Sequence, residues 1–398
     1  MKNIKQVLAE PHYMLYNMMY WVANSLYEPY IVVYMESRGL SSAQIGLVLG
    51  IMRVLTVVGS FAIGYASDRS RSPKLIIFLS SVGGVAAVSI TGHGHLFPVL
   101  AVGCALYGFF AIPSLDIVDK LIVENVKNGA QLLGLFRMFG SLGYSLGALG
   151  AGALVAKFQY TEMFFWCNVS LLVCVILCFF MHGSAKVSGL RENKVPLSKI
   201  FRNPISLYIY GCQTLWGCVE GGSLSYATLF VTDQGYSADL PAWFIAAAML
   251  GQIAMFTILS MWIQDKMAPQ RLMATAGLMV AARLYSYAAV SYLPLPLILL
   301  FQAVGGAGFS CFIHASVELI AASYPESVSS TAQTLKSVFY RGIGSSAGAI
   351  AFGFLYEQLP PALLMHCSTM LSVFYTIFSL ILFHAVQHMT RTGRSAQS

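Results

Sequence analysis

The stretch LLGLFRMFGSLGYSLGALGAGALV, from Leu132 to Val155, decides the fold of this chain. It carries one charge, Arg137, in an otherwise uncharged run. Four of its six glycines recur at intervals of three or four residues: Gly140, Gly143, Gly147 and Gly150. As a helix the run would be long enough to cross the hydrocarbon of a bilayer, which takes about 20 residues. One face of that helix would be nearly bare of side chains, so it is predicted to pack closely against a neighbouring helix.

The composition of the whole chain indicates an integral membrane protein. Of its 398 residues, 57% are hydrophobic and 10% are charged, and the mean hydropathy is +0.69. In a soluble domain roughly a quarter of the residues are charged, so most of the exterior of this protein must face lipid. We predict twelve membrane spans, at approximately 12–35, 43–67, 75–93, 97–121, 130–156, 161–182, 205–231, 240–264, 271–292, 295–321, 331–356 and 361–387.

The net charge of +7 is best interpreted through its distribution along the chain. If both termini are cytoplasmic, sixteen basic residues of the loops and termini lie inside and only Arg38 and Lys157 lie outside. This split follows the positive-inside rule and fixes the orientation. The plasma membrane, the inner membrane of a bacterium, is the predicted location. Nucleic-acid binding is not expected, because the basic residues reflect topology.

Two halves of the chain repeat each other. The polar segment 183–204 separates six spans from six, which predicts an N-terminal bundle at 1–182, a cytoplasmic linker, a C-terminal bundle at 205–388 and a tail at 389–398. GYASDRSRSPK after the second span is echoed by MWIQDKMAPQR after the eighth. Parallel repeats of this kind are typical of secondary transporters, whose substrate site lies between the halves.

The first of these loops resembles the loop motif of the major facilitator superfamily. Gly64, Asp68 and Arg69 match its Gly-x-x-x-Asp-Arg, and Asp265 and Lys266 repeat the acid and the base in the second half. The later Gly-Arg-Arg of the motif is replaced by Arg71, Ser72 and Pro73. Physically, an acid and bases at this place can clamp neighbouring helix ends. The resemblance implies an all-α fold of two pseudo-symmetric six-helix bundles.

Charged residues inside the predicted spans mark the candidate functional positions. A charge at mid-membrane costs about 3 kcal/mol or more, so it normally faces a partner or a water-filled cavity. Acids and bases are balanced, five of each, as an internally paired network requires. They are Glu28, Arg53, Asp116, Asp119, Arg137, Glu220, Arg283, Glu318, Lys336 and Arg341.

The interval from Asp116 to Tyr144 resembles the lactose-permease-like branch, which includes oligosaccharide–proton symporters and phenylpropionate-permease-like proteins. That branch has an acid on the fourth span, an arginine eighteen residues later and an aromatic residue seven beyond. Asp119, Arg137 and Tyr144 occupy these places, with tyrosine for tryptophan. The resemblance implies that they bind a sugar. The residue types suit this role, because a carboxylate accepts hydroxyl hydrogen bonds and a guanidinium donates them in a fork.

The second half resembles the same branch and departs from it. Glu220 and Arg341 stand where the branch has an acid–lysine pair between spans 7 and 11, which we interpret as structural. Arg283 matches an arginine that acts there in proton coupling. The proton-handling residues of the branch are missing, since the corresponding positions hold Gln252, Gly305 and Gly308.

Proton coupling must therefore rest on other groups or be absent. His314 and Glu318 share one helix face, and this histidine either titrates near neutral pH or is a hydrogen-bonded structural group. Asp116 lies one turn from Asp119, so the two carboxylates either share a proton or Asp116 binds Lys120. Beyond these two pairs, Glu28 either forms a buried ion pair with Arg53 or carries a proton.

Taken together, the sequence predicts a monomeric transporter that works by alternating access. Its expected solute is a small polar molecule, most simply a sugar or glycoside moved with protons. The alternatives are an exporter of drug-like or metabolite solutes, an uncoupled facilitator, or a transporter-like sensor. No nucleophile–base set, nucleotide-binding loop or metal-ligand cluster is present, so no enzyme activity, cofactor or metal is expected.

Overall fold

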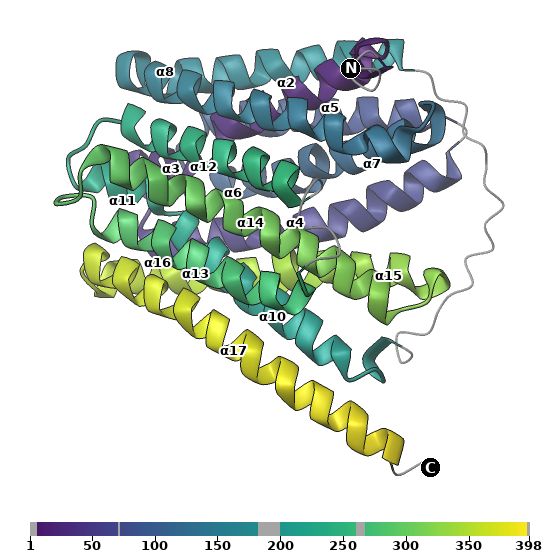
Figure 1. The fold of residues 1–398 in the computed structure, drawn as a ribbon. Helices are drawn as coiled ribbons and strands as arrows, with labels where there is room; N and C mark the ends of the chain where they lie inside the picture. Colours follow the sequence, from purple (N-terminus) through teal and green to yellow (C-terminus); the bar gives the residue numbers. More distant parts are fainter. Residues whose placement is uncertain (1–5, 71, 182–199, 260–266, 396–398) are drawn as a thin grey trace. The chain divides into compact units, whose positions relative to one another are not determined.

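A computed structural model describes residues 6–70, 72–181, 200–259 and 267–395 of the chain (Figure 1). Every regular element in these ranges is helical. The contacts divide the chain into two compact units. Unit 1 comprises the described parts of Met1–Gly189 and Ser225–Met249, and unit 2 those of Leu190–Leu224 and Leu250–Ser398. The predicted boundary at segment 183–204 stays a prediction, because most of that segment lies outside the described residues.

Unit 1 is built from helices whose starts follow local sequence signals. Ser41 and Gln44 form a capping box at the start of one long helix, and prolines occupy the first turn of several others, where their missing N–H costs nothing. The elements are α2 (Pro11–Tyr27), α3 (Ile31–Ser37), α4 (Ser42–Arg69), α5 (Pro73–His93), α6 (Phe97–Leu106), η1 (Tyr107–Ala111), α7 (Ile112–Asn125), α8 (Gly129–Phe180) and α11 (Ala227–Asp233). Helix α12 (Asp239–Ile258) begins in this unit.

Unit 2 is likewise helical, and two of its elements are π-helical turns. A π-helical turn holds an extra residue within an α-helix and is frequent at functional sites. The elements are α10 (Ile205–Val219), η2 (Glu220–Leu224), α13 (Pro269–Ala288), α14 (Leu295–Ser323), α15 (Glu326–Ser337), η4 (Val338–Ser345), α16 (Ser346–Gln358) and α17 (Pro361–Ser395). Both turns lie at places where the sequence predicts uninterrupted spans.

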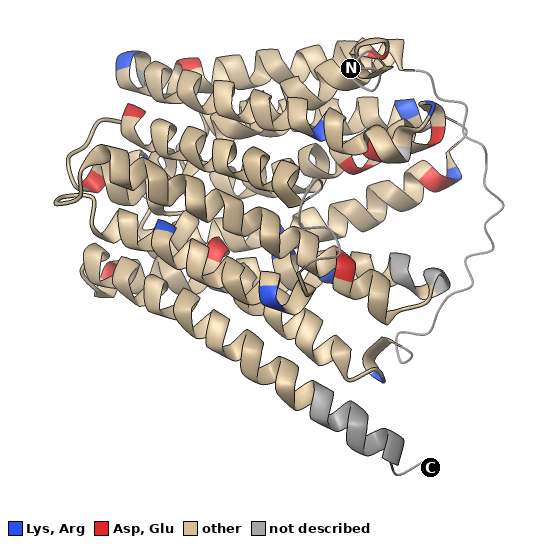
Figure 2. Cartoon of the chain, viewed as in Figure 1, with Lys and Arg blue, Asp and Glu red and all other residues tan. Residues whose placement is uncertain are grey.

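Nine helices among the described residues are long and apolar enough to cross a membrane. Two of them, residues 131–158 and 160–180, lie within α8. The three remaining predicted spans coincide with α2–α3, α10–η2–α11 and α13. The first of these is interrupted next to Pro29, which has no N–H to continue a helix, and the second is interrupted by η2. The arrangement is consistent with twelve spans, and Figure 2 shows long helical stretches without a charge.

Three glycines of the opening stretch, Gly140, Gly143 and Gly147, pack against α2, which runs beside α8 (Figure 1). A Cβ added at Gly143 would strike the backbone of Met18, and one at Gly147 would lie 2.9 Å from the backbone of Val22. The two helices therefore meet backbone to backbone. Only residues without a Cβ allow so close a crossing.

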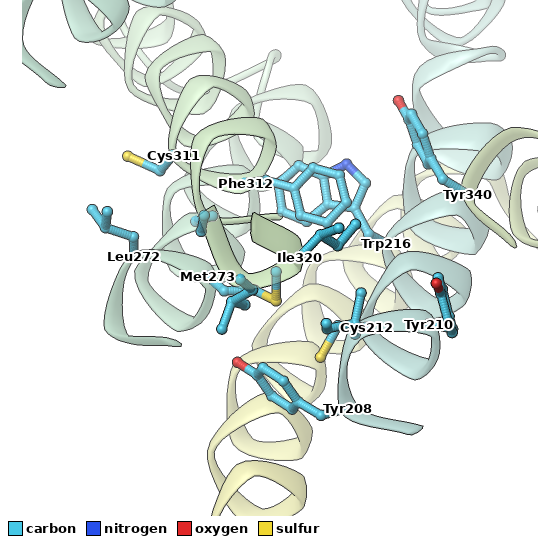
Figure 3. Packing of buried hydrophobic residues seen from close by; sticks show 14 of the residues in the cluster. Tyr208, Tyr210, Cys212, Trp216, Leu272, Met273, Cys311, Phe312, Ile320 and Tyr340 are labelled. Carbon is cyan, nitrogen blue, oxygen red and sulfur yellow. The ribbon is translucent and has the colours of Figure 1, made fainter. Parts of the chain in front are cut away.

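Unit 2 contains a crossing of the same kind. A Cβ at Gly344 of η4 would lie 3.0 Å from the Cα of Thr214 in α10, and one at Gly348 would lie 2.7 Å from the Cα of Cys218. The core beside this crossing is aromatic. Figure 3 shows the rings of Trp216 and Phe312 face to face, with centroids 4.1 Å apart and planes 5° from parallel.

Candidate functional site

The site in unit 1 is centred on Asp119 of α7 and Arg137 of α8. Arg137 donates to one carboxylate oxygen, Oδ2, from Nη2 at 2.8 Å and from Nε at 3.1 Å. The other oxygen, Oδ1, is buried and has no hydrogen-bond partner in the described part of the chain. The Asp119 side chain is 11% exposed and that of Arg137 is 61% exposed. The acid is therefore a buried anchor, and the guanidinium keeps an accessible edge for a further acceptor.

Tyr144 lies two helical turns after Arg137 and contacts an aromatic residue from α2. Its ring meets Trp21 edge to face, with centroids 5.8 Å apart and planes at 67°. Sequence reasoning missed Trp21. The signal that could have found it was the glycine ladder of Gly140, Gly143, Gly147 and Gly150, because the helix packed on it supplies the nearest side chains. Gly140 receives the indole directly, since a Cβ there would lie 2.8 Å from Nε1 of Trp21.

Asp116 and the loop motif form a second polar group on α4 and α7. Ser60 donates to Oδ2 of Asp116 at 3.1 Å. Lys120 pairs with Asp68 of the loop motif and lies 3.8 Å from Glu124. Asp68 at the end of α4 is thus paired with Lys120 of α7, which also lies near Glu124, and the clamping role of the loop motif stays a prediction.

The remaining loop-motif residues have separate surroundings. The guanidinium of Arg69 lies over the ring of Tyr65, 4.4 Å from its centroid. Gly64 has open space around it, so close packing is not what requires a glycine there. Asp265 and Lys266 lie outside the described residues.

Glu28 and Arg53 lie in unit 1 on α2 and α4. Glu28 caps the C-terminal end of α2, immediately before Pro29, and its backbone N–H donates to the carbonyl of Asn24 at 2.8 Å. Arg53 donates from Nη2 to the hydroxyl of Ser225. Arg53 therefore ties α4 to the segment that precedes α11. A Glu28–Arg53 pair stays a prediction.

In unit 2 the carboxylate of Glu220 accepts a hydrogen bond from the hydroxyl of Tyr340. Glu220 begins η2, and Tyr340 and the exposed Arg341 lie in η4. The two π-helical turns thus meet through a tyrosine that the sequence did not single out. The pairing of Glu220 with Arg341 stays a prediction.

Arg283 of α13 contacts an amide from α14. Its Nε donates to Oε1 of Gln302 at 2.8 Å, and Nε2 of Gln302 donates to Ser286 at 3.0 Å. A Cβ at Gly305 would lie 2.6 Å from Cδ of Arg283. The stem of Arg283 therefore occupies the space that a larger residue at position 305 would need.

The other two positions that depart from the resemblance also have packing roles. A Cβ at Gly308 would lie 2.8 Å from Cβ of Met279, and the backbone carbonyl of Gln252 accepts a hydrogen bond from Ser310 at 2.9 Å. His314 lies 3.6 Å from Glu318 on α14, with both side chains about one-third exposed. Among the described residues no group of three or more His, Cys, Asp or Glu gathers to hold a metal.

Comparisons with known proteins agree on the class of the chain. Residues 12–366 match the family model of the MFS_1 like family. A maltose permease of Geobacillus stearothermophilus is 24% identical over 351 residues, 87% of either chain. Sugar efflux transporter B of Salmonella typhimurium is 25% identical over 165 residues, 40% of this chain and 42% of that protein. The crystal structure of the nucleoside transporter NupG matches with a TM-score of 0.78 at 13% identity, covering 95% of this chain and 98% of that one, which confirms the predicted fold.

Proposed function

The chain belongs to the MFS_1 like family, so it is a multi-pass membrane transporter, and we propose that its solute is a sugar or a glycoside. Two of these similarities support a sugar, since one relative is named a maltose permease and another a sugar efflux transporter. The single observation that carries the proposal is the Asp119–Arg137 pair. A guanidinium oriented by a buried carboxylate and open on its other edge suits a neutral solute rich in hydroxyl oxygens.

Tyr144 completes a site that is chemically matched to a pyranose. Sugar rings present polar hydroxyls at their rim and C–H groups on one face. Arg137 supplies donors for the rim, and the ring of Tyr144 supplies an apolar surface seven residues further along α8. Asp116, on the helix that carries Asp119, adds a second carboxylate as an acceptor for hydroxyl groups.

We further propose alternating access driven by protons, in a monomer whose termini are both cytoplasmic in a bacterial inner membrane. His314 with Glu318 is the pair that would carry the proton, because Gln252, Gly305 and Gly308 have no titratable group. Export is the second candidate, favoured by the similarity to a sugar efflux transporter over part of the chain.

Uptake by proteoliposomes tests these proposals. Labelled maltose, D-xylose and a nucleoside would be offered with and without an imposed pH gradient. Asp119→Ala and Arg137→Ala are expected to abolish sugar accumulation, whereas Lys157→Ala, which removes an exposed charge at the other end of the same span, is expected to leave it unchanged. Sugar uptake by Asp119→Ala equal to that of the unaltered protein would refute the proposed site.

A further inference from the structure

We propose that Trp21 of α2 contacts the solute and forms the second aromatic wall of the site, so that the preferred substrates are pyranosides with an apolar C–H face. This inference rests on the proposed function and deepens it.

Arg137, Gly140 and Tyr144 share one face of α8, because they follow one another at intervals of three and four residues. The indole of Trp21 lies on Gly140, in the gap between the arginine and the tyrosine. A Cβ at Gly140 would be 2.8 Å from Nε1 and 3.3 Å from Cγ of Trp21. The absence of a side chain at position 140 is therefore what admits the indole between Arg137 and Tyr144.

Trp21 differs from the other aromatic residues of α2. Four tyrosines of this helix are 2% exposed or less and belong to the packed interior of unit 1: Tyr13, Tyr16, Tyr20 and Tyr27. Trp21 is only half-buried. Its ring meets Tyr144 and Tyr20 edge to face and lies on Gly140, which leaves only part of its surface open.

That open surface does not face acyl chains. Arg137 lies one helical turn from Gly140 with 61% of its side chain exposed, and an exposed guanidinium inside a span requires water or a polar partner. The surface shared by Arg137 and Trp21 is consequently polar at one end and aromatic at the other. A lipid-facing tryptophan would not share its face with an exposed charge.

The geometry of the ring pair points to the shape of the solute. The planes of Trp21 and Tyr144 meet at 67°, so a flat ligand stacked on one ring meets the edge of the other. A pyranose stacked by its C–H face on one ring keeps its rim hydroxyls towards Arg137. An acyclic polyol offers the same hydroxyls without the flat apolar face.

The test measures the apparent KM and maximal rate of uptake in proteoliposomes for labelled maltose, methyl β-D-galactoside and D-sorbitol. Trp21→Leu is expected to raise KM for the pyranosides about tenfold, the effect of losing about 1.4 kcal/mol of binding free energy, with little change in maximal rate. Trp21→Phe keeps an aromatic face and is expected to recover most of that loss.

Gly140→Ala offers a second approach without altering any ring. The added methyl group displaces the indole and is expected to raise KM in the same direction, whereas Gly134→Ala and Gly150→Ala, where a Cβ meets open space, leave KM unchanged. Unaltered KM in both Trp21→Leu and Gly140→Ala would overturn the role of Trp21 while leaving the proposed function intact. Failure of the unaltered protein to take up either pyranoside would refute the proposed function and this inference together.

Discussion

Two helix crossings, one in each unit, are built in the same way but differ in the side chains beside them. In unit 1, α2 crosses α8; in unit 2, α10 crosses η4 and α16. In unit 1, Gly143 and Gly147 contact Met18 and Val22. In unit 2, Gly344 and Gly348 contact Thr214 and Cys218. In each unit the second contact lies four residues after the first on both helices. The two units therefore share the same backbone-to-backbone contact.

The two crossings differ in where the bulky side chains lie. In unit 1 the partner helix presents Trp21 to a glycine of the ladder, Gly140. In unit 2 the partner helix presents Gly217, whose Cβ would lie 2.8 Å from the backbone of Ser345 in a π-helical turn. The repeat therefore fixes how the helices cross, whereas the side chains beside the crossing are free to differ. We expect the aromatic and charged contacts of the solute in unit 1, where Trp21 lies on Gly140 one helical turn from the exposed Arg137.

Removing the carboxylate of unit 1 has the largest expected effect. Asp119→Ala leaves the guanidinium of Arg137 without its anchor, and losing one partner of a hydrogen-bonded charge pair costs about 2–5 kcal/mol. Sugar uptake is expected to fall about a hundredfold or more. Glu220→Ala in unit 2 is the matched change, and it should reduce uptake much less. Equal losses in both variants would contradict the asymmetry between the units.

The glycine ladder of unit 1 and the matching glycines of unit 2, Gly344 and Gly348, provide the next prediction. Gly143→Ala and Gly344→Ala each force a methyl group against the backbone of a neighbouring helix, which costs about 1–3 kcal/mol of stability. Thermal unfolding of the detergent-solubilised protein should show a similar loss for both, with Gly134→Ala and Gly150→Ala unaffected as controls. If only one of the two variants unfolds at a lower temperature, the crossings are not equivalent.

The hydrogen bond between Tyr340 of η4 and Glu220 of η2 is expected to contribute less to the stability of the protein. Tyr340→Phe removes the hydroxyl that donates to Glu220 and leaves the ring in place, at a cost of about 1–2 kcal/mol in stability. Tyr292→Phe, at an exposed loop position, is the control. An unchanged unfolding temperature for Tyr340→Phe would mean that the two π-helical turns do not depend on this bond.

The clamp between Asp68 and Lys120 is expected to have the smallest effect. Both side chains are more than one-third exposed, and ion pairs of this kind contribute about 0–1 kcal/mol and weaken with salt. Asp68→Asn should lower the unfolding temperature slightly at low ionic strength and not at 1 M salt. A large loss that persists in salt would show that the clamp is more than a surface pair.

Much of the fold could be predicted from the sequence because the signals are local. Apolar runs long enough to cross a bilayer predict spans wherever they occur, and nine of them match helices among the described residues. The family resemblance predicted that Asp119 and Arg137 lie close to each other, and Nη2 of Arg137 does lie 2.8 Å from Oδ2 of Asp119. Interrupted spans were harder to foresee, since η2 and η4 fall within runs whose hydropathy looks continuous.

The sequence by itself determined that this chain lies in a membrane and that the charges inside its spans need polar partners or water, because placing polar groups in hydrocarbon is costly. That its halves repeat is predicted from their similar loop motifs. Only the tertiary structure decided that Trp21 lies on Gly140, that Tyr340 bonds to Glu220 and that the stem of Arg283 fills the space beside Gly305. These contacts join residues far apart in the chain. Their partners are selected by the distance at which two helix backbones cross, and no local pattern of residues encodes that distance.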